Sequence, residues 1–264
     1  MSPYRYHAGQ TPLLISVPHA GTFVPARILD GMTKQARMLP DTDWYVDHLY
    51  DFAQDLGASL VVATHSRYVI DVNRPPDDRP LYPGADNTGL CPTTLFDRTP
   101  IYVAGQEPDE TEIARRLNAV WQPYHDRLAE SLRHAVERYG IALLYEAHTI
   151  RSRVPRFFQG RLPDLNLGTA DGESAAHELE TRMFAVCHSA RSYTSVLNGR
   201  FKGGYITRHY GRPVDNVHVV QLELSQQTYM EEEPPFRFDE TRANRIRTVL
   251  RELVGVMLDW GGHR

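Results

Sequence analysis

The chain has 264 residues, of which 41% are hydrophobic, and its formal net charge is -4 at pH 7. This composition is typical of a folded globular domain and argues against a disordered, collagen-like or coiled-coil chain. The small negative charge gives no electrostatic reason to bind nucleic acid or an anionic membrane. No apolar stretch approaches the roughly 18 residues that span a bilayer, and the first residues lack the apolar core of a signal peptide. We therefore expect a cytoplasmic protein without nucleic-acid or membrane partners.

Apolar periodicity and turn residues predict strands that alternate with long helices. Strands are expected in the apolar run before Pro18 and at residues 59–64, 68–72, 141–145 and 217–224, with short extended pieces at 194–197 and 204–207. Helices are expected at residues 26–38, 44–56, 110–139, 174–191 and 240–260. This alternation predicts one α/β domain over residues 1–264, with three α/β/α layers around a mixed, mostly parallel sheet.

Residues 73–105 are rich in proline, glycine and aspartate and show no clear periodicity. A loop of this length in a compact domain is usually either functional or disordered. It carries apolar side chains that a disordered linker seldom holds, namely Leu81, Tyr82, Leu90, Leu95 and Phe96. We therefore predict a long ordered loop over the active site.

Two histidines follow apolar runs that are expected to be buried strands. His19 follows the first run and lies between Pro18 and Gly21, and His148 follows the run that begins at residue 141. In open α/β sheets the ligand site lies beyond the carboxyl ends of the strands, so both imidazoles are expected to face one crevice. Glu146 would point to the same face as His148 and could orient a neighbouring ligand. The alternative is that both histidines are ordinary hydrogen-bonded residues of a loop and of the core.

Acidic residues cluster at Asp41, Asp43 and Asp47. Acids at a helix N-terminus offset the helix dipole, but three acids exceed what capping needs. Zinc hydrolases usually use two histidines and one carboxylate, so Asp43 is a natural third ligand if its loop lies beside His19. A third apolar run, at residues 217–224, carries another carboxylate, Glu223. These residues together form the inventory of a catalytic zinc site.

Arg74 ends the predicted strand 68–72 and precedes Pro75. Because a proline forces the preceding residue into an extended conformation, this guanidinium is suited to bidentate capture of a substrate carboxylate. The alternative is a surface ion pair with Asp71 or Asp77.

The run 199–211 is the densest cationic and glycine-rich segment of the chain, and it contains Arg200, Lys202, Arg208 and His209. It lacks the Lys-Ser/Thr ending of a P-loop and does not open a convincing helix, so a nucleotide-binding role is rejected. We expect its backbone to approach a small anion instead.

Six motifs stand in a specific order along the chain. They are His19 in Ser-Val-Pro-His-Ala-Gly, Asp43 in Asp-Thr-Asp-Trp, Arg74 in Asp-Val-Asn-Arg-Pro-Pro, His148 in Glu-Ala-His-Thr, the run 198–211, and Glu223 in Gln-Leu-Glu-Leu. From about Pro12 to Met230, this series strongly resembles the N-formylglutamate amidohydrolase family. The wider family is similar to zinc carboxypeptidases, which implies a mixed sheet flanked by helices and a hydrolytic zinc.

In the wider family the first metal segment is His-x-x-Glu, a consecutive Asn-Arg pair holds a substrate carboxylate, and a late glutamate is the general base. Here Asn73 and Arg74 match the pair, and Glu223 matches the base. Thr22 stands where the first glutamate would be, so the resemblance leaves the carboxylate ligand to come from elsewhere. Asp43 is preferred over its two acidic neighbours.

The resemblance implies hydrolysis of N-formyl-L-glutamate to formate and L-glutamate, the last step of a histidine degradation route. One divalent metal ion, with Zn²⁺ expected, would be held by His19, Asp43 and His148. Glu223 would act as general base, with Glu146 as the other candidate acid, and His209 could stabilise the oxyanion. The small dicarboxylate substrate needs two cationic anchors, for which the candidates are Asn73 with Arg74, and one of Arg200, Lys202 or Arg208.

Two other functions stay open from the sequence. The first is a related zinc amidohydrolase that acts on another N-acyl amino acid or on a peptide C-terminus. The second is a non-catalytic protein that binds a small anion through Arg74 and the run 199–211. The sequence also leaves a homo-oligomer open.

Overall fold

A computed structural model describes residues 1–80, 84 and 86–262. Within these residues, seven strands form one mixed sheet in the order β1-β3-β2-β4-β7-β5-β6. The strands are β1 (Tyr4–His7), β2 (Leu13–Val17), β3 (Ser59–Ala63), β4 (Ala142–Ile150), β5 (Leu165–Gly168), β6 (Ser195–Leu197) and β7 (Val217–Ser225). The central strands β3, β2, β4 and β7 are parallel, whereas β1 and β5 run antiparallel to β3 and β7. The predicted fold class is therefore confirmed.

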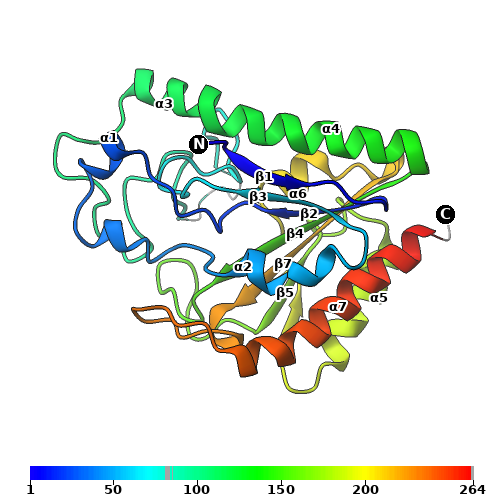
Figure 1. Ribbon diagram of the computed structural model, residues 1–264. Coiled ribbons are helices and arrows are strands. Elements are labelled where there is room, and N and C mark those ends of the chain that lie inside the picture. The colour runs from blue at the N-terminus through cyan, green and yellow to red at the C-terminus, as the bar shows by residue number, and fades with distance from the viewer. Residues whose placement is uncertain (81–83, 85, 263–264) are drawn as a thin grey trace.

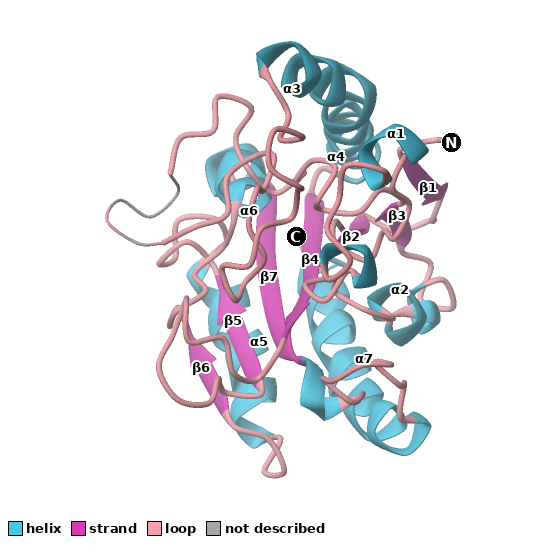
Figure 2. Ribbon diagram, turned by 90° about the vertical axis from the view of Figure 1, so that its left-hand side faces the viewer, coloured by secondary structure: helices cyan, strands magenta, loops and turns pink. Residues whose placement is uncertain are grey.

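Helices cover both faces of the sheet, as Figures 1 and 2 show. The α-helices are α1 (Ala26–Leu29), α2 (Val46–Leu49), α3 (Glu110–Arg116), α4 (Gln122–Tyr139), α5 (His177–Ser189), α6 (Tyr205–Tyr210) and α7 (Glu240–Gly262). A π-helical turn at Leu117–Trp121 joins α3 to α4, and 3-10 turns lie at Ala36–Met38, Asp51–Ala53, Pro213–Asp215 and Gln226–Thr228. None of the described helices is both long enough and apolar enough to cross a membrane.

Side chains of the central strands alternate between two cores. Leu14 and Leu144 pack in one core with residues of α4 and α6, and Leu13 and Leu143 pack in the other with residues of α5 and α7. Every residue of β4 and β7 is buried. Strands buried on both faces read as nearly continuous apolar runs, which is why the sequence revealed them.

The predicted helices at 26–38 and 44–56 are wrong as continuous elements. In the first, the Thr33 N–H donates to the Ile101 carbonyl and the Val103 N–H donates to the Gly31 carbonyl, both at 2.9 Å. These bonds to a distant loop replace the hydrogen bonds that a continuous helix would make. In the second, Tyr45 adopts a left-handed conformation with φ 62° immediately before α2. Only short helical pieces remain in both segments.

Two extended segments were also predicted wrongly. Residues 68–72 form turns rather than a strand, and the Asp71 N–H donates to the Leu90 carbonyl at 2.7 Å. Residues 204–207 include the first turn of α6. The short strands β1 and β5 were missed, because four residues carry too little periodicity to stand out.

The described part of the loop 73–105 contains no helix or regular strand. Leu81 and Tyr82 lie outside the described residues, whereas Leu90, Leu95 and Phe96 are buried. Its apolar side chains therefore pack into the domain where they are described, and its role as a cover over the active site stays a prediction.

Candidate metal centre and active site

His19 lies just beyond the carboxyl end of β2, a strand buried between β3 and β4. Its loop packs closely on the chain after β3, because a Cβ at Gly21 would lie 2.3 Å from the His65 carbonyl oxygen. Nε2 of His19 lies 2.7 Å from Oδ1 of Asp71, and its Nδ1 lies 3.8 Å from Oδ2 of Asp43. The loop thus turns Nδ1 toward Asp43.

His148 lies near the carboxyl end of β4, and its ring centroid is 4.9 Å from that of His19. Its Nδ1 lies 3.3 Å from Oδ2 of Asp43, and its Nε2 lies 2.7 Å from Oε1 of Glu146. Each imidazole therefore meets a separate carboxylate through Nε2. A carboxylate on the outer nitrogen fixes the ring and its tautomer, an arrangement typical of metal-binding histidines.

Asp43 completes the cluster and is only 1% exposed. Its Oδ2 accepts a hydrogen bond from the Thr149 N–H at 2.9 Å, but its buried Oδ1 has no hydrogen-bond partner. One ligand atom from each of Asp43, His19 and His148 lies within 4.8 Å of the others. Oδ2 is the oxygen that the two imidazoles approach, whereas Oδ1 faces the Arg67 guanidinium at 3.6 Å. Two imidazole nitrogens and a buried carboxylate at this spacing fit a divalent metal ion.

The two other acids of the predicted cluster face elsewhere. Asp41 accepts hydrogen bonds from the Tyr68 hydroxyl at 2.7 Å and from the Phe96 N–H at 2.9 Å, and its Oδ1 pairs with Arg151. Asp47 pairs with Arg5 near the surface. Asp41 is thus a structural acid, and the geometry favours Asp43 as the third ligand.

The acids around His148 favour a positive charge at that ring, whereas burial and Arg67 lower the pKa of His19. Burial alone would lower the pKa of His148, but Glu146 and Asp43 raise it to about 10. Likewise, burial would raise the pKa of Asp71, but His19 and Arg67 hold it well below its usual range. A metal ion would supply the positive charge that a proton on the imidazole otherwise supplies.

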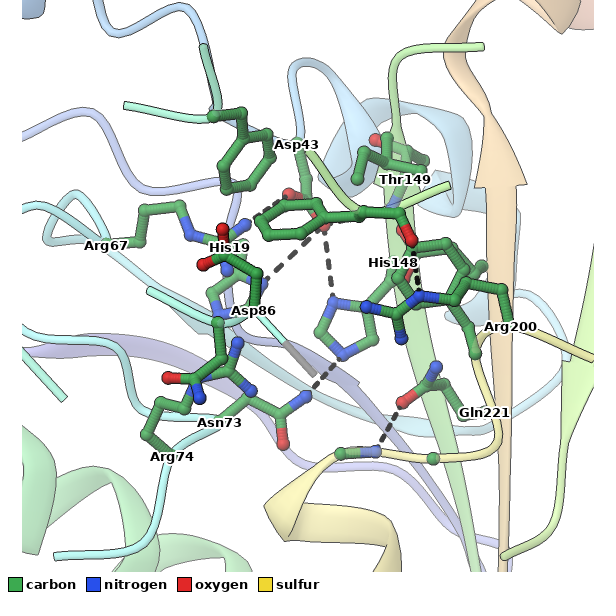
Figure 3. A pocket seen from close by; sticks show the side chains of 18 residues that line it. His19, Asp43, Arg67, Asn73, Arg74, Asp86, His148, Thr149, Arg200 and Gln221 are labelled. Carbon is green, nitrogen blue, oxygen red and sulfur yellow. Dashed lines mark hydrogen bonds and ion pairs between the residues drawn. The ribbon is translucent and has the colours of Figure 1, made fainter. Parts of the chain in front are cut away.

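Glu223 lies on β7 directly beside His148 in the parallel pairing with β4. It lines the same cavity as His19, Asp43 and His148, and this cavity has a volume of about 90 Å³. Figure 3 labels the latter three side chains in the cavity wall. Burial raises the pKa of Glu223 to about 8, with further contributions from Asp43 and Glu146. A carboxyl group with such a pKa can both accept and donate a proton near neutral pH. Glu146 is not among the described residues that line the cavity.

Asn73 and Arg74 enter the cavity wall from the loop beyond β3. Nδ2 of Asn73 lies 2.9 Å from Nε2 of His148, and its Oδ1 accepts a hydrogen bond from the Ile206 N–H at 2.9 Å. The Arg74 carbonyl accepts a hydrogen bond from Nε1 of the buried Trp121 at 2.9 Å. Asn73 therefore ties His148 to α6, and Trp121 holds the backbone that carries Arg74.

Of the four candidate residues in the run 199–211, one lies in the described cavity wall and three do not. Arg200 lines the cavity and is labelled in Figure 3. Lys202 pairs with Asp171 at 2.9 Å, and Arg208 donates through Nε to the Gly203 carbonyl. His209 is exposed and stacks on Tyr205. Lys202, Arg208 and His209 are not among the described residues that line the cavity. Lys202 is engaged by Asp171, whereas Arg208 and His209 lie on α6.

A sequence profile of the N-formylglutamate amidohydrolase family matches residues 11–230. The chain belongs to this family. It is 52% identical over 259 residues to N-formylglutamate deformylases of Pseudomonas putida and Pseudomonas aeruginosa, covering 98% of this chain and 97% of each relative. The crystal structure of N-formylglutamate amidohydrolase from Ralstonia eutropha JMP134 matches with a TM-score of 0.82 at 27% identity, covering 100% of this chain and 98% of that chain.

Family membership confirms that the protein is an enzyme, a hydrolase of amide bonds, and rules out a purely anion-binding role. The membership of this family that the six ordered motifs predicted is likewise confirmed. Its more distant likeness to zinc carboxypeptidases stays a prediction, as do the roles of individual site residues.

From the sequence, Asp71 was considered only as an ion-pair partner of Arg74, and three further residues of the amidohydrolase site were not identified. Arg67 pairs with Asp71 at 2.7 Å and with Asp43 at 3.6 Å, and it packs over the Phe96 ring. Gln221 lines the cavity and accepts a hydrogen bond from the Gly204 N–H, and Thr207 donates to Glu146 at 2.5 Å. Arg67 comes three residues after the predicted strand 59–64, which is the one signal that could have indicated it. For Gln221 and Thr207, only the tertiary contacts reveal a role.

Proposed function

We propose that this amidohydrolase hydrolyses the formyl amide of N-formyl-L-glutamate, releasing formate and L-glutamate. The observation that supports this most directly is the meeting of the His19, Asp43 and His148 cluster with Glu223 and Arg74 around one cavity. Two relatives at 52% identity bear the name N-formylglutamate deformylase. The family resemblance also supports a place for the reaction at the last step of a histidine degradation route.

The proposed cofactor is one divalent metal ion, Zn²⁺, held by His19, Asp43 and His148. Two imidazole nitrogens and one carboxylate oxygen match the ligand set of catalytic zinc sites, which keep one position open. When bound there, the ion supplies Lewis acidity to the reaction. Asp71 and Glu146 keep the two imidazoles oriented from behind.

Glu223 is the proposed general base. It accepts a proton from the water that attacks the formyl carbon, and it then delivers that proton to the amide nitrogen as the C–N bond breaks. The oxygen of the water leaves in formate, and the nitrogen leaves as the amine of glutamate. A positioned acid-base group of this kind typically contributes about 10²–10⁴-fold to the rate. Arg74 holds a carboxylate of the substrate during these steps.

The test is an assay of formate release by the purified protein with N-formyl-L-glutamate. Chelation followed by dialysis should abolish turnover, and added Zn²⁺ should restore it, whereas a sample dialysed without chelator should stay active. Turnover that survives complete removal of metal would contradict the metal proposal. Absence of formate release from the metal-loaded protein would contradict the substrate proposal.

The acyl group is tested separately with N-acetyl- and N-succinyl-L-glutamate. We expect a preference for the formyl group, because larger acyl groups need more room beside the metal ligands. A higher kcat/KM for either larger acyl group would favour the alternative of a related deacylase.

A further inference from the structure

We propose that Arg200 recognises the side-chain carboxylate of the substrate and that Arg74 recognises its α-carboxylate. Arg200 would then determine which N-formyl amino acid the enzyme accepts. This inference rests on the proposed function and extends it, because it assigns the two charges of the substrate to two separate loops.

The first step of the argument is the distance of each carboxylate from the reacting carbon. The α-carboxylate of an N-formyl amino acid lies close to the formyl group, whereas the side-chain carboxylate of glutamate lies further away by the length of two methylene groups. Arg74 directly follows Asn73, whose amide contacts the metal-ligand candidate His148. Arg74 is therefore placed for the nearer carboxylate.

Arg200 reaches the cavity from a different part of the fold. It follows the edge strand β6, whereas Arg74 follows β3 on the other side of the central strands. Nε of Arg200 donates to the Phe157 carbonyl at 2.7 Å, and its guanidinium carbon lies 5.3 Å from the centre of the Phe201 ring. A guanidinium held against aromatic rings is well oriented and weakly hydrated, both of which favour binding of a carboxylate.

The other cations around the site are less suitable. Arg67 also lines the cavity, but it pairs with two buried carboxylates, Asp71 and Asp43. Its charge is thus already balanced inside the protein. Lys202 pairs with Asp171, and neither Lys202 nor Arg208 is among the described residues of the cavity wall. Arg74 and Arg200 are the other described arginines of the cavity wall, and we assign them to the two carboxylates.

The test compares N-formyl-L-glutamate with N-formyl-L-glutamine, which has the same length but a neutral side-chain amide. The wild-type enzyme should prefer the glutamate compound. Arg200→Met should lower kcat/KM for N-formylglutamate by about 10- to 100-fold and for N-formylglutamine by less than about threefold. Arg74→Met should lower kcat/KM for both compounds by similar factors, because both retain the α-carboxylate.

Two further variants control the comparison. Arg200→Lys keeps a positive charge but cannot bind a carboxylate through two parallel hydrogen bonds, so it should retain part of the preference for N-formylglutamate over N-formylglutamine. If Arg200→Met does not fold, the comparison is made with Arg200→Lys. Arg133→Met removes one charge from the surface of α4, where the Arg133 side chain is 63% exposed, and should leave the preference unchanged. Bound metal and melting temperature are measured for each variant.

Equal losses on both substrates in Arg200→Met, or an unchanged preference in both Arg200 variants, would overturn this inference alone. Failure of the wild-type enzyme to release formate from N-formylglutamate would overturn the proposed function and this inference with it. The two failures are thus told apart by the wild-type assay.

Discussion

Oδ1 of Asp71 lies 2.7 Å from Nε2 of His19, and both side chains are buried. Arg67 binds the other oxygen of the same carboxylate at 2.7 Å. Asp71 is thus held on both sides, and it in turn holds the imidazole so that Nδ1 points toward Asp43. The orientation of a proposed metal ligand therefore depends on a carboxylate that does not itself belong to the ligand cluster.

Asp71→Asn should weaken metal affinity by about 10- to 100-fold, because the neutral amide orients the imidazole less firmly and makes it a weaker ligand. Metal affinity is measured by competition with a chelator of known affinity. Asp86→Asn is the matched control, since Asp86 lines the cavity but pairs with Arg156 and Arg98 rather than with a histidine. Equal affinities in wild type and Asp71→Asn would argue against an orienting role.

Asp41 and Asp43 provide a matched pair of buried acids two residues apart. Asp43→Asn should abolish stoichiometric metal binding, because the proposed ligand oxygen loses its charge. Asp41→Asn should keep the metal but lower the melting temperature, because it weakens the bonds to Tyr68 and Arg151. Elemental analysis measures the bound metal in both variants, and thermal unfolding measures their melting temperatures. Metal loss in Asp41→Asn with retention in Asp43→Asn would reverse the assignment.

Glu223→Gln should lower kcat by about 10²–10⁴-fold while bound metal, KM and melting temperature stay near wild type. The amide keeps the shape of the side chain but cannot accept a proton from water. Steady-state kinetics at saturating substrate test this expectation. A kcat near the wild-type value would remove Glu223 from the role of base, and a large fall in melting temperature would indicate a structural role instead.

His125 should make the stability of the protein sensitive to acid. It is only 4% exposed, its Nε2 bonds the Val72 carbonyl at 2.8 Å, and burial lowers its pKa to about 3. In the unfolded chain, the His125 imidazole is protonated below about pH 6.5, whereas in the folded protein it stays neutral until about pH 3. The free energy of unfolding therefore falls as the pH drops below about 6.5. This residue alone should contribute a loss of about 2 kcal/mol by pH 5.

His125→Phe provides the comparison, because phenylalanine can keep the stacking on Trp121 and Tyr210 but cannot titrate. This variant should be less stable at pH 8, where it lacks the hydrogen bonds, yet lose less stability between pH 7 and pH 5. Urea unfolding across that range measures both trends. Parallel pH profiles for the two proteins would contradict the expectation.

Much of the central fold and the main site residues could be predicted from the sequence. The inner strands β2, β4 and β7 are buried on both faces, so they appear as apolar runs that end in His19, His148 and Glu223. The carboxyl ends of these parallel strands lie at one edge of the sheet, which is enough to place the three side chains near one another. The preference for Asp43 came from the acidic cluster and the usual ligand set of zinc hydrolases, and its position beside the two histidines supports it.

Other features were decided only by contacts between distant segments. The helical pattern at 26–38 is broken by hydrogen bonds to residues 101–103, which local periodicity does not record. Asp71 and Arg67 became part of the site because a segment with strand-like residues folds into turns beside His19 and Asp43. The presence of Arg200 in the cavity wall, and the absence of Lys202 and Arg208 from its described lining, likewise depend on tertiary contacts. Lys202 pairs with Asp171, and Arg208 lies on α6, part of which was predicted as extended chain. Burial periodicity identifies the strands that carry a site, whereas the direction of each loop side chain depends on hydrogen bonds and ion pairs that form only in the folded protein.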